Sequence, residues 1–216
     1  MFPLSDSIRS NRFPILNILL IGFTVFVFFQ QFMSSSQEDF INQYALIPAL
    51  IDFSNLQTLY PFITAIFLHG GFLHIISNMW FLWVFGDNVE GHFGLIPYFF
   101  LYFISGIGGN IAQYLLAPDS QIPMLGASGA VAGVLGAYYV LFPHSKIKTL
   151  VPFFGFLSVV DISAPFMLGY WFVLQLISGA ASLGTLGTMG GVAFWAHVGG
   201  FASGVLFARA IHMEEE

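Results

Sequence analysis

The chain has 216 residues, of which 57% are hydrophobic and only 7% are charged, and its mean hydropathy is +0.83. Soluble domains carry about 25% charged residues, so this composition excludes an ordinary water-soluble protein and is typical of a helical membrane protein. The net charge is −6 and no basic patch for nucleic acid is visible, while the absence of Cys excludes disulfides, thiolate metal sites and cysteine nucleophiles.

Six segments are predicted to be transmembrane helices, because a span needs about 20 mostly apolar residues. In chain order they are residues 14–33, 62–85, 93–117, 125–142, 165–180 and 191–209. The first exceeds a typical secretory signal core and lacks a clear cleavage site, so we interpret it as a retained helix. The start of the fifth is the least defined, because residues 147–164 also fit a segment that lies at the membrane interface. We therefore predict an all-α membrane protein, with residues 1–216 forming a single six-helix bundle.

The connections between these helices predict how the chain is oriented. The longest, residues 34–61, mixes carboxylates and prolines with apolar residues, and we expect it to lie partly embedded at the interface. The basic residues fall in the N-terminal tail, the loop after the fourth helix and the end of the sixth. They are Arg9, Arg12, Lys146, Lys148 and Arg209. Because Lys and Arg collect on the cytoplasmic side, both termini are predicted to be cytoplasmic and the 34–61 loop to face outward.

Two reactive side chains lie inside the apolar segments. Ser128 lies in the fourth segment and His197 in the sixth, at similar heights of roughly 18 to 21 Å above the inner helix ends. Polar side chains are costly in lipid, so an intramembrane histidine is a functional-site hypothesis. A histidine can take the proton of a serine and return it to a leaving amine. The pair is therefore predicted to be a nucleophile and a base.

Small residues recur on the predicted faces of both helices. They are Ala132 and Gly136, at four-residue spacing from Ser128, and Gly200 and Gly204, on the face of His197. Such faces let two helix backbones approach closely, which a short serine side chain needs in order to reach a histidine. Taken alone, these glycines have an alternative interpretation, in which they only allow the helices to pack closely and have no link to a catalytic site.

Candidate oxyanion donors lie at a similar height. His74 and Asn78 are four residues apart on one face of the second helix, and the backbone N–H groups of Gly126 and Ser128 begin the fourth. A structural hydrogen bond is the alternative role for His74. None of the 11 acidic residues falls at the depth of His197, so the sequence predicts a Ser–His dyad rather than a triad.

The other histidines are given lesser roles. His69 lies five residues before His74 and is expected to point elsewhere and to support the loop or helix. His92 and His144 are expected to be solvated at inner helix ends, and His212 belongs to the tail. No metal ligand set is predicted. The tryptophans are interpreted as lipid-facing or packing residues, and they are Trp80, Trp83, Trp171 and Trp195.

With these motifs, the chain resembles the rhomboid intramembrane serine proteases of the basic six-helix bacterial type. The resemblance covers residues 12–209 in order and spacing. Its motifs are Gly126-Ala127-Ser128-Gly129, Ala196-His197 followed by Gly200 and Gly204, and His69-x4-His74-x3-Asn78. It implies an endopeptidase that cuts peptide bonds in or near transmembrane segments of other membrane proteins through an acyl-enzyme, without a cofactor. The implied roles are Ser128 as nucleophile, His197 as general base and acid, His74, Asn78 and the Ser128 N–H as oxyanion donors, and His69, Gly129, Gly200 and Gly204 as structural support.

The resemblance also implies a setting for the site. The 34–61 loop would be partly inserted, and the fifth helix with the 181–190 loop would form a mobile gate and cap. Expected partners are transmembrane substrates and the bilayer of a prokaryotic plasma membrane, without nucleic acid, and the oligomeric state stays open. Two departures are visible: the first loop lacks a Trp-Arg pair, and Ala132 replaces an aromatic residue that packs on the histidine in some members. The ring would need other support, from Phe194, Trp195 or Phe201.

Two other classes of function are weighed against a protease. A catalytically silent rhomboid-like protein that binds transmembrane clients is disfavoured, because Ser128 and His197 are both present. A small transporter or channel with a proton or metal path through His74 and His197 is disfavoured, because no intramembrane carboxylate pairs with them. Two histidines without a third ligand also make a poor metal site.

Overall fold

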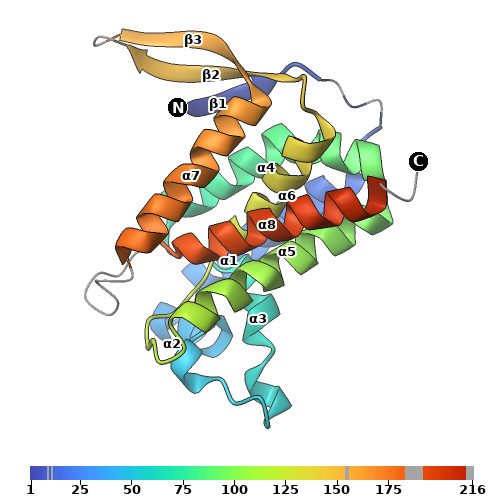
Figure 1. Cartoon of the computed structure of the whole chain (residues 1–216). Helices are drawn as coiled ribbons and strands as arrows, with labels where there is room; N and C mark the ends of the chain where they lie inside the picture. Colours follow the sequence, from blue (N-terminus) through green and yellow to red (C-terminus); the bar gives the residue numbers. More distant parts are fainter. Residues whose placement is uncertain (9, 11, 154–155, 183–191, 213–216) are drawn as a thin grey trace.

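Figure 1 shows a bundle of long helices with a small β-sheet at one end and short helices at the other. This computed structural model describes residues 1–8, 10, 12–153, 156–182 and 192–212. Within these residues, the helices of 14 or more residues are α1 (Ile15–Phe32), α4 (Phe72–Phe93), α5 (Leu95–Leu116), α6 (Ser128–Leu141), α7 (Ala164–Ser182) and α8 (Phe194–His212).

The long helices form an integral membrane bundle. Four of them, α1, α5, α7 and α8, are each long and apolar enough to cross a membrane. The central helix α6 has only 14 residues, about 21 Å at the rise of an α-helix, and every residue from 129 to 138 is buried. Because other helices enclose it, α6 does not need to match the full thickness of the hydrocarbon. The predicted class, an all-α membrane bundle, is confirmed. Helix α6, with 14 residues, is shorter than the about 20 residues that a transmembrane helix needs.

The second predicted helix, 62–85, is wrong at both ends. The chain forms α3 (Pro61–Thr64) and a 3-10 turn at Ala65–Phe67, and then bends by 79° into α4, which continues to Phe93. The bend occurs at two consecutive glycines, and Gly71 has a φ of +157°, which residues with a Cβ rarely adopt. This break moves the start of α4 to Phe72, two residues before His74.

A three-stranded antiparallel sheet replaces the predicted interfacial segment. Its order is β1 (Phe2–Asp6), β2 (Lys146–Phe153) and β3 (Phe156–Ser163), with Phe2 opposite Leu150 and Lys148 opposite Asp161. Residues 146–149 alternate between exposed and buried, which is the period of a half-buried strand. The fifth helix therefore does not start before Ala164, and the two strands β2 and β3 were not predicted.

Strand β1 is fastened to the helices by polar contacts. The indole N–H of Trp80 donates to the carbonyl of Pro3 over 2.7 Å. The Asp6 carboxylate accepts from the Tyr138 hydroxyl over 2.6 Å and from the Asn88 amide over 2.7 Å. Burial raises the pKa of the Asp6 carboxyl, and these two donors partly offset that effect. The N-terminal strand is thus tied to α4 and α6 as well as to β2.

The basic residues of the described chain lie at the end of the bundle that carries the sheet. β1 and β2 pair there, so the N-terminal segment and Lys146 and Lys148 share one end. Arg12 lies near Gly94, after α4, and Phe207 near the end of α8 stacks edge-on against Phe93. Arg209 follows Phe207 by two residues, while Arg9 lies outside the described residues. This arrangement agrees with the predicted charge pattern.

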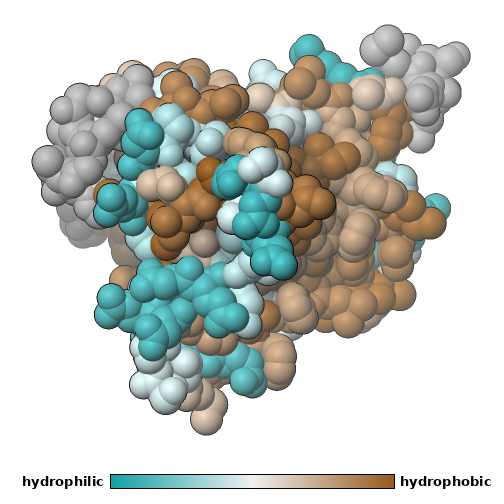
Figure 2. All heavy atoms as spheres, turned by 90° about the horizontal axis from the view of Figure 1, so that it is seen from below, coloured by the Kyte–Doolittle hydropathy of each residue, from teal (hydrophilic) through white to brown (hydrophobic). Residues whose placement is uncertain are grey.

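The opposite end is formed by the 34–61 connection. It contains α2 (Gln37–Tyr44), capped by the Ser36 side chain, and short 3-10 helices. Leu46 pairs with Met124 just before α6, which fixes this connection beside the start of that helix. Figure 2, which views this end, shows hydrophilic residues gathered on one part of it and a broad hydrophobic surface beside them. The exposed apolar side chains of α1, such as Phe23 and Phe26, match a lipid-facing surface.

Candidate active site

The predicted site residues lie at the first turns of three helices. Ser128 is the first residue of α6, His197 is the fourth of α8 and His74 is the third of α4. Asn78 follows His74 by one turn and is buried. The N-terminus of a helix carries N–H groups without intrahelical acceptors and the positive end of the helix dipole. Negative charge is therefore favoured near the N-termini of these helices.

Glycine contacts bring α6 and α8 into backbone contact. A Cβ at Gly200 would overlap the carbonyl of Gly129, and a Cβ at Gly204 would overlap the carbonyl of Gly133. At the level of the site, a Cβ at Gly129 would lie 3.4 Å from the carbonyl oxygen of Ala196, the residue before His197. The close packing expected of these two helices is therefore present, but on α6 these contacts are made by Gly129 and Gly133, which do not belong to the predicted face of Ala132 and Gly136. Ser128 and His197 are each next in sequence to a residue of this contact.

His197 has a partner that was not anticipated. Its Nδ1 lies 2.8 Å from Oε1 of Gln175 on α7, and its ring lies 5.8 Å from the Trp171 ring at 30° and 6.4 Å from the Phe194 ring. Of the three aromatic residues expected to support the ring, Phe194 is in contact. Within the described residues, no hydrogen bond joins Ser128 to His197, and Ser128 has no side-chain partner. Catalytic hydrogen bonds are often long before substrate binds.

His74 is held so that one ring nitrogen faces the start of α6. The N–H of Gly70 donates to its Nδ1 over 3.3 Å, so the neutral ring carries its proton on Nε2. That Nε2 lies 2.8 Å from the place a Cβ would occupy at Gly126, two residues before Ser128, and the Asn78 amide lies 3.8 Å from the same point. Both donors therefore converge on a space that exists only because residue 126 has no side chain.

The backbone of Gly126 does not have the role that the sequence suggested. Its N–H already donates to the carbonyl of Ala65 over 2.9 Å, so it has no proton to offer an oxyanion. Its φ of +129° lies where L residues are strained, and a side chain there would collide with His74. The expectation of a Gly126 donor is wrong, and this glycine provides room instead. The Ser128 N–H lies in the first turn of α6, where no intrahelical acceptor exists.

His69 lies beside His74 rather than pointing elsewhere, so that part of the prediction is wrong. The two rings are 5.0 Å apart, and Nε2 of His69 lies 3.0 Å from the Asn78 amide nitrogen. The His69 backbone is clamped at both polar groups by the Gln31 side chain of α1, at 2.7 and 3.2 Å. Because the chain bends sharply just before α4, His69 lies beside the first turn of that helix, against His74. The contacts of His69 are those of a supporting residue for Asn78.

The remaining histidines are separate from the site. His92 and His144 are exposed near the sheet end, as expected, and the side chain of His212 lies outside the described residues. Within the described part of the chain, no three His, Asp or Glu side chains are grouped so as to hold a metal ion. Most of the expected 181–190 cap also lies outside the described residues.

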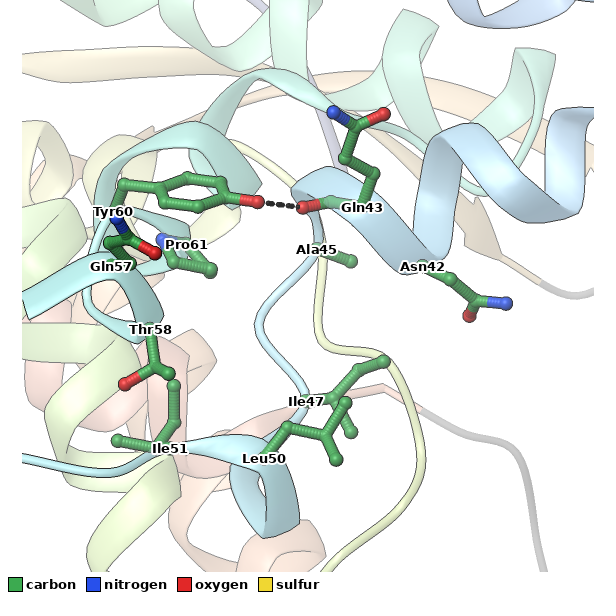
Figure 3. Close-up of a pocket in the computed structure, with 10 residues that line it drawn as sticks. All are labelled: Asn42, Gln43, Ala45, Ile47, Leu50, Ile51, Gln57, Thr58, Tyr60 and Pro61. Carbon is green, nitrogen blue, oxygen red and sulfur yellow. Dashed lines mark hydrogen bonds between the residues drawn. The ribbon is translucent and has the colours of Figure 1, made fainter. Parts of the chain in front are cut away.

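A pocket of about 170 Å³ lies in the 34–61 connection rather than at the serine and histidine. Figure 3 shows its lining, in which the Tyr60 hydroxyl donates to the carbonyl of Gln43. The lining is uncharged and includes no histidine or acidic side chain. This pocket has no group that could act as a nucleophile and base pair.

Comparison with known proteins identifies the family. The Rhomboid domain model matches residues 56–214. Similar proteins include RHOMBOID-like protein 5 of Arabidopsis thaliana, 44% identical over 75 residues (35% of this chain, 24% of that protein), and Rhomboid-like protein 11, chloroplastic, of the same plant, 33% identical over 138 residues (60% and 44%). The Rhomboid protease GluP of Bacillus subtilis (strain 168) is 32% identical over 125 residues (57% and 23%).

The chain belongs to the rhomboid family, whose members are generally intramembrane serine proteases. It spans less than half the length of these three relatives. The family predicted from the motifs is confirmed, together with its membrane-embedded helical class.

Proposed function

We propose that this chain is an intramembrane serine endopeptidase, with residues 1–216 acting as one rhomboid domain and with a Ser128–His197 dyad. The observation that carries the proposal is that the start of α6 lies against both other helices: His74 and Asn78 lie near Gly126, two residues before Ser128, and Ala196, the residue before His197, lies near Gly129. Backbone contact between α6 and α8 supports it, because it holds the nucleophile and base on neighbouring turns.

The mechanism assigns a role to each of these groups. The Ser128 Oγ attacks the carbonyl carbon of the scissile peptide while Nε2 of His197 takes its proton. The oxyanion that forms accepts hydrogen bonds from Nε2–H of His74, the Asn78 amide and the Ser128 N–H. When the C–N bond breaks, His197 returns the proton to the leaving amine. A water molecule, deprotonated by His197, then attacks the acyl-enzyme ester, and His197 returns this proton to the departing Ser128 Oγ.

We further propose the setting of this activity. The substrates are transmembrane segments of other proteins, and the chain lies in a prokaryotic plasma membrane with both termini cytoplasmic. The clustering of Arg12, Lys146, Lys148 and Arg209 at the sheet end supports this orientation. Neither a metal nor a cofactor enters the mechanism.

A fluorophosphonate probe tests the proposal on the purified protein. The serine oxygen displaces fluoride from phosphorus, so labelling reports an activated nucleophile. We expect the wild type to be labelled and Ser128→Ala to remain unlabelled. Labelling that survives Ser128→Ala would disprove the assignment of the nucleophile. A folded wild type that is not labelled would instead favour a silent rhomboid-like protein that binds transmembrane clients.

The oxyanion donor is tested by Asn78→Ala. We expect the limiting rate of probe labelling to fall about ten- to a thousandfold, the cost of losing one such donor. The measurement is the labelling rate as a function of probe concentration. Ile76→Ala, on the exposed face of the same helix, is the control and is expected to label like the wild type. An Asn78→Ala variant that keeps its rate would remove Asn78 from the oxyanion site.

A further inference from the structure

One face of α7 is directed at the start of α8. Trp171, Gln175 and Gly179 follow at four-residue spacing and therefore share this face. The first two contact His197, as described above, and the carbonyl of Gly179 accepts from the Trp195 indole over 3.1 Å. A Cβ at Gly179 would press on the same indole at 3.0 Å. The α7 face is thus held against α8 on both sides of Gln175.

Gln175 is out of place in a helix that otherwise faces lipid and apolar core. Its flanking residues Val173, Leu174 and Ile177 are exposed apolar side chains, whereas Gln175 is half-buried. Its carbonyl oxygen is within hydrogen-bond distance of the His197 ring. An amide oxygen with no partner would be costly at this depth, so the contact both satisfies the Oε1 of Gln175 and fixes the histidine.

The hydrogen bond decides which nitrogen of His197 is basic. An amide oxygen can only accept, so Nδ1 must carry the ring proton, and the lone pair is then on Nε2. A histidine that acts as the base for a serine needs its lone pair on Nε2 and a fixed ring orientation. In serine triads, a carboxylate holds the histidine in this tautomer and orientation. We propose that Gln175, with Trp171 against the ring, is the positioning residue for His197. This inference rests on the proposed protease function.

The aromatic contact completes the support of the ring. Ala132, one turn after Ser128 on α6, has no ring to place against His197. The Trp171 ring lies at 30° to the imidazole and also lies 6.2 Å from the Phe201 ring, so it fills the space between α7 and α8. A ring held between an amide and an indole loses the freedom to rotate away from the serine. Gln175 and Trp171 both belong to α7, so the orientation of His197 on α8 depends on the contact between these two helices.

Three variants of the full chain test the role of Gln175. Gln175→Met keeps the length but removes the acceptor, Gln175→Glu keeps an acceptor, and Ile177→Met makes a matched change at an exposed position of α7. We expect Gln175→Met to lower the limiting rate of fluorophosphonate labelling about a hundredfold with unchanged probe affinity, the lower end of the range for a positioned base. Gln175→Glu should stay within about threefold of the wild type, because a carboxylate also accepts from Nδ1–H.

A spectroscopic readout tests the same contact without a variant at Gln175. In ¹⁵N NMR spectra of the wild type, the His197 signals, assigned by their loss in His197→Ala, should show a protonated Nδ1 and an unprotonated Nε2. A protonated Nε2, or a Gln175→Met variant that labels within about threefold of wild type, would overturn the inference. If Gln175→Met does not fold, judged by its melting temperature against Ile177→Met, the Gln175→Glu rate and the wild-type spectrum decide.

The outcomes separate this inference from the proposed function. A wild type that is not labelled would argue against the protease assignment, whatever the tautomer of His197. A labelled wild type with an Nε2-protonated His197 would keep the protease assignment and reject the role of Gln175.

Discussion

Cleavage is expected to fall more than about 10⁴-fold in His197→Ala and in Ser128→Ala, with no further loss in the double variant, because nucleophile and base act as one unit. In Ser128→Ala no oxygen is left to attack, and in His197→Ala no base is left to take its proton. The measurement is the rate at which purified protein in liposomes cleaves a transmembrane substrate. That substrate can be found by comparing membrane proteomes with and without active Ser128.

The controls for this prediction separate catalysis from folding. His92→Ala removes an exposed histidine near the sheet end and should leave cleavage unchanged. His197→Ala should keep its helical content and melting temperature within a few degrees of the wild type, because a smaller residue fits at the start of α8. Losses in the two single variants that add in the double variant would contradict a shared role in one reaction.

A single methyl group at Gly200 is expected to destabilise the bundle. No Cβ fits there, because it would overlap the carbonyl of Gly129, so Gly200→Ala must push α6 and α8 apart. Overpacking of a tight interior costs typically 1–3 kcal/mol, and we expect about 3 kcal/mol here because the obstacle is backbone. For a chain of this size, that corresponds to a fall of roughly 10 °C in melting temperature. Labelling of Ser128 should fall with it.

Gly22→Ala is the matched control for this substitution. Gly22 also lies in a membrane-spanning helix, α1, but nothing lies within 4 Å of a Cβ built there. The same change should leave the melting temperature unchanged or slightly raise it, since alanine favours a helix over glycine. Equal effects of the two substitutions would show that backbone contact between α6 and α8 does not hold the site together.

The site was predictable from the sequence to the extent that its groups are polar residues in apolar surroundings. Ser128, His197 and His74 stand out in this way, and counting helical residues predicts a common level for them. Gln175 was missed because an uncharged amide carries no titration chemistry, although it is a polar residue within the long apolar run of α7. The occupied Gly126 amide could not be foreseen, since its acceptor is the carbonyl of Ala65, 61 residues earlier in the chain.

The fold was predictable where one helix occupies one apolar run. Helices α1, α5 and α7 begin and end within two residues of the predicted bounds. The bend before α4 was missed because Gly70 and Gly71 interrupt an apolar run without adding polarity. The sheet was missed because most of residues 147–164 are apolar, as in an interfacial helix, and the alternation of a half-buried strand covers only residues 146–149.

The pairing of Phe2 with Leu150 also sets an order of events during synthesis. A ribosome adds about 5–20 residues per second, so roughly 7–30 s pass between the emergence of β1 and that of its partner strand. Throughout this time β1 lacks the strand that completes its backbone hydrogen bonds in the folded protein, while α1, α4, α5 and α6 are being synthesised. The sheet therefore cannot form before the long helices α1, α4, α5 and α6 have been synthesised, and it joins a strand that precedes them to a strand that follows them.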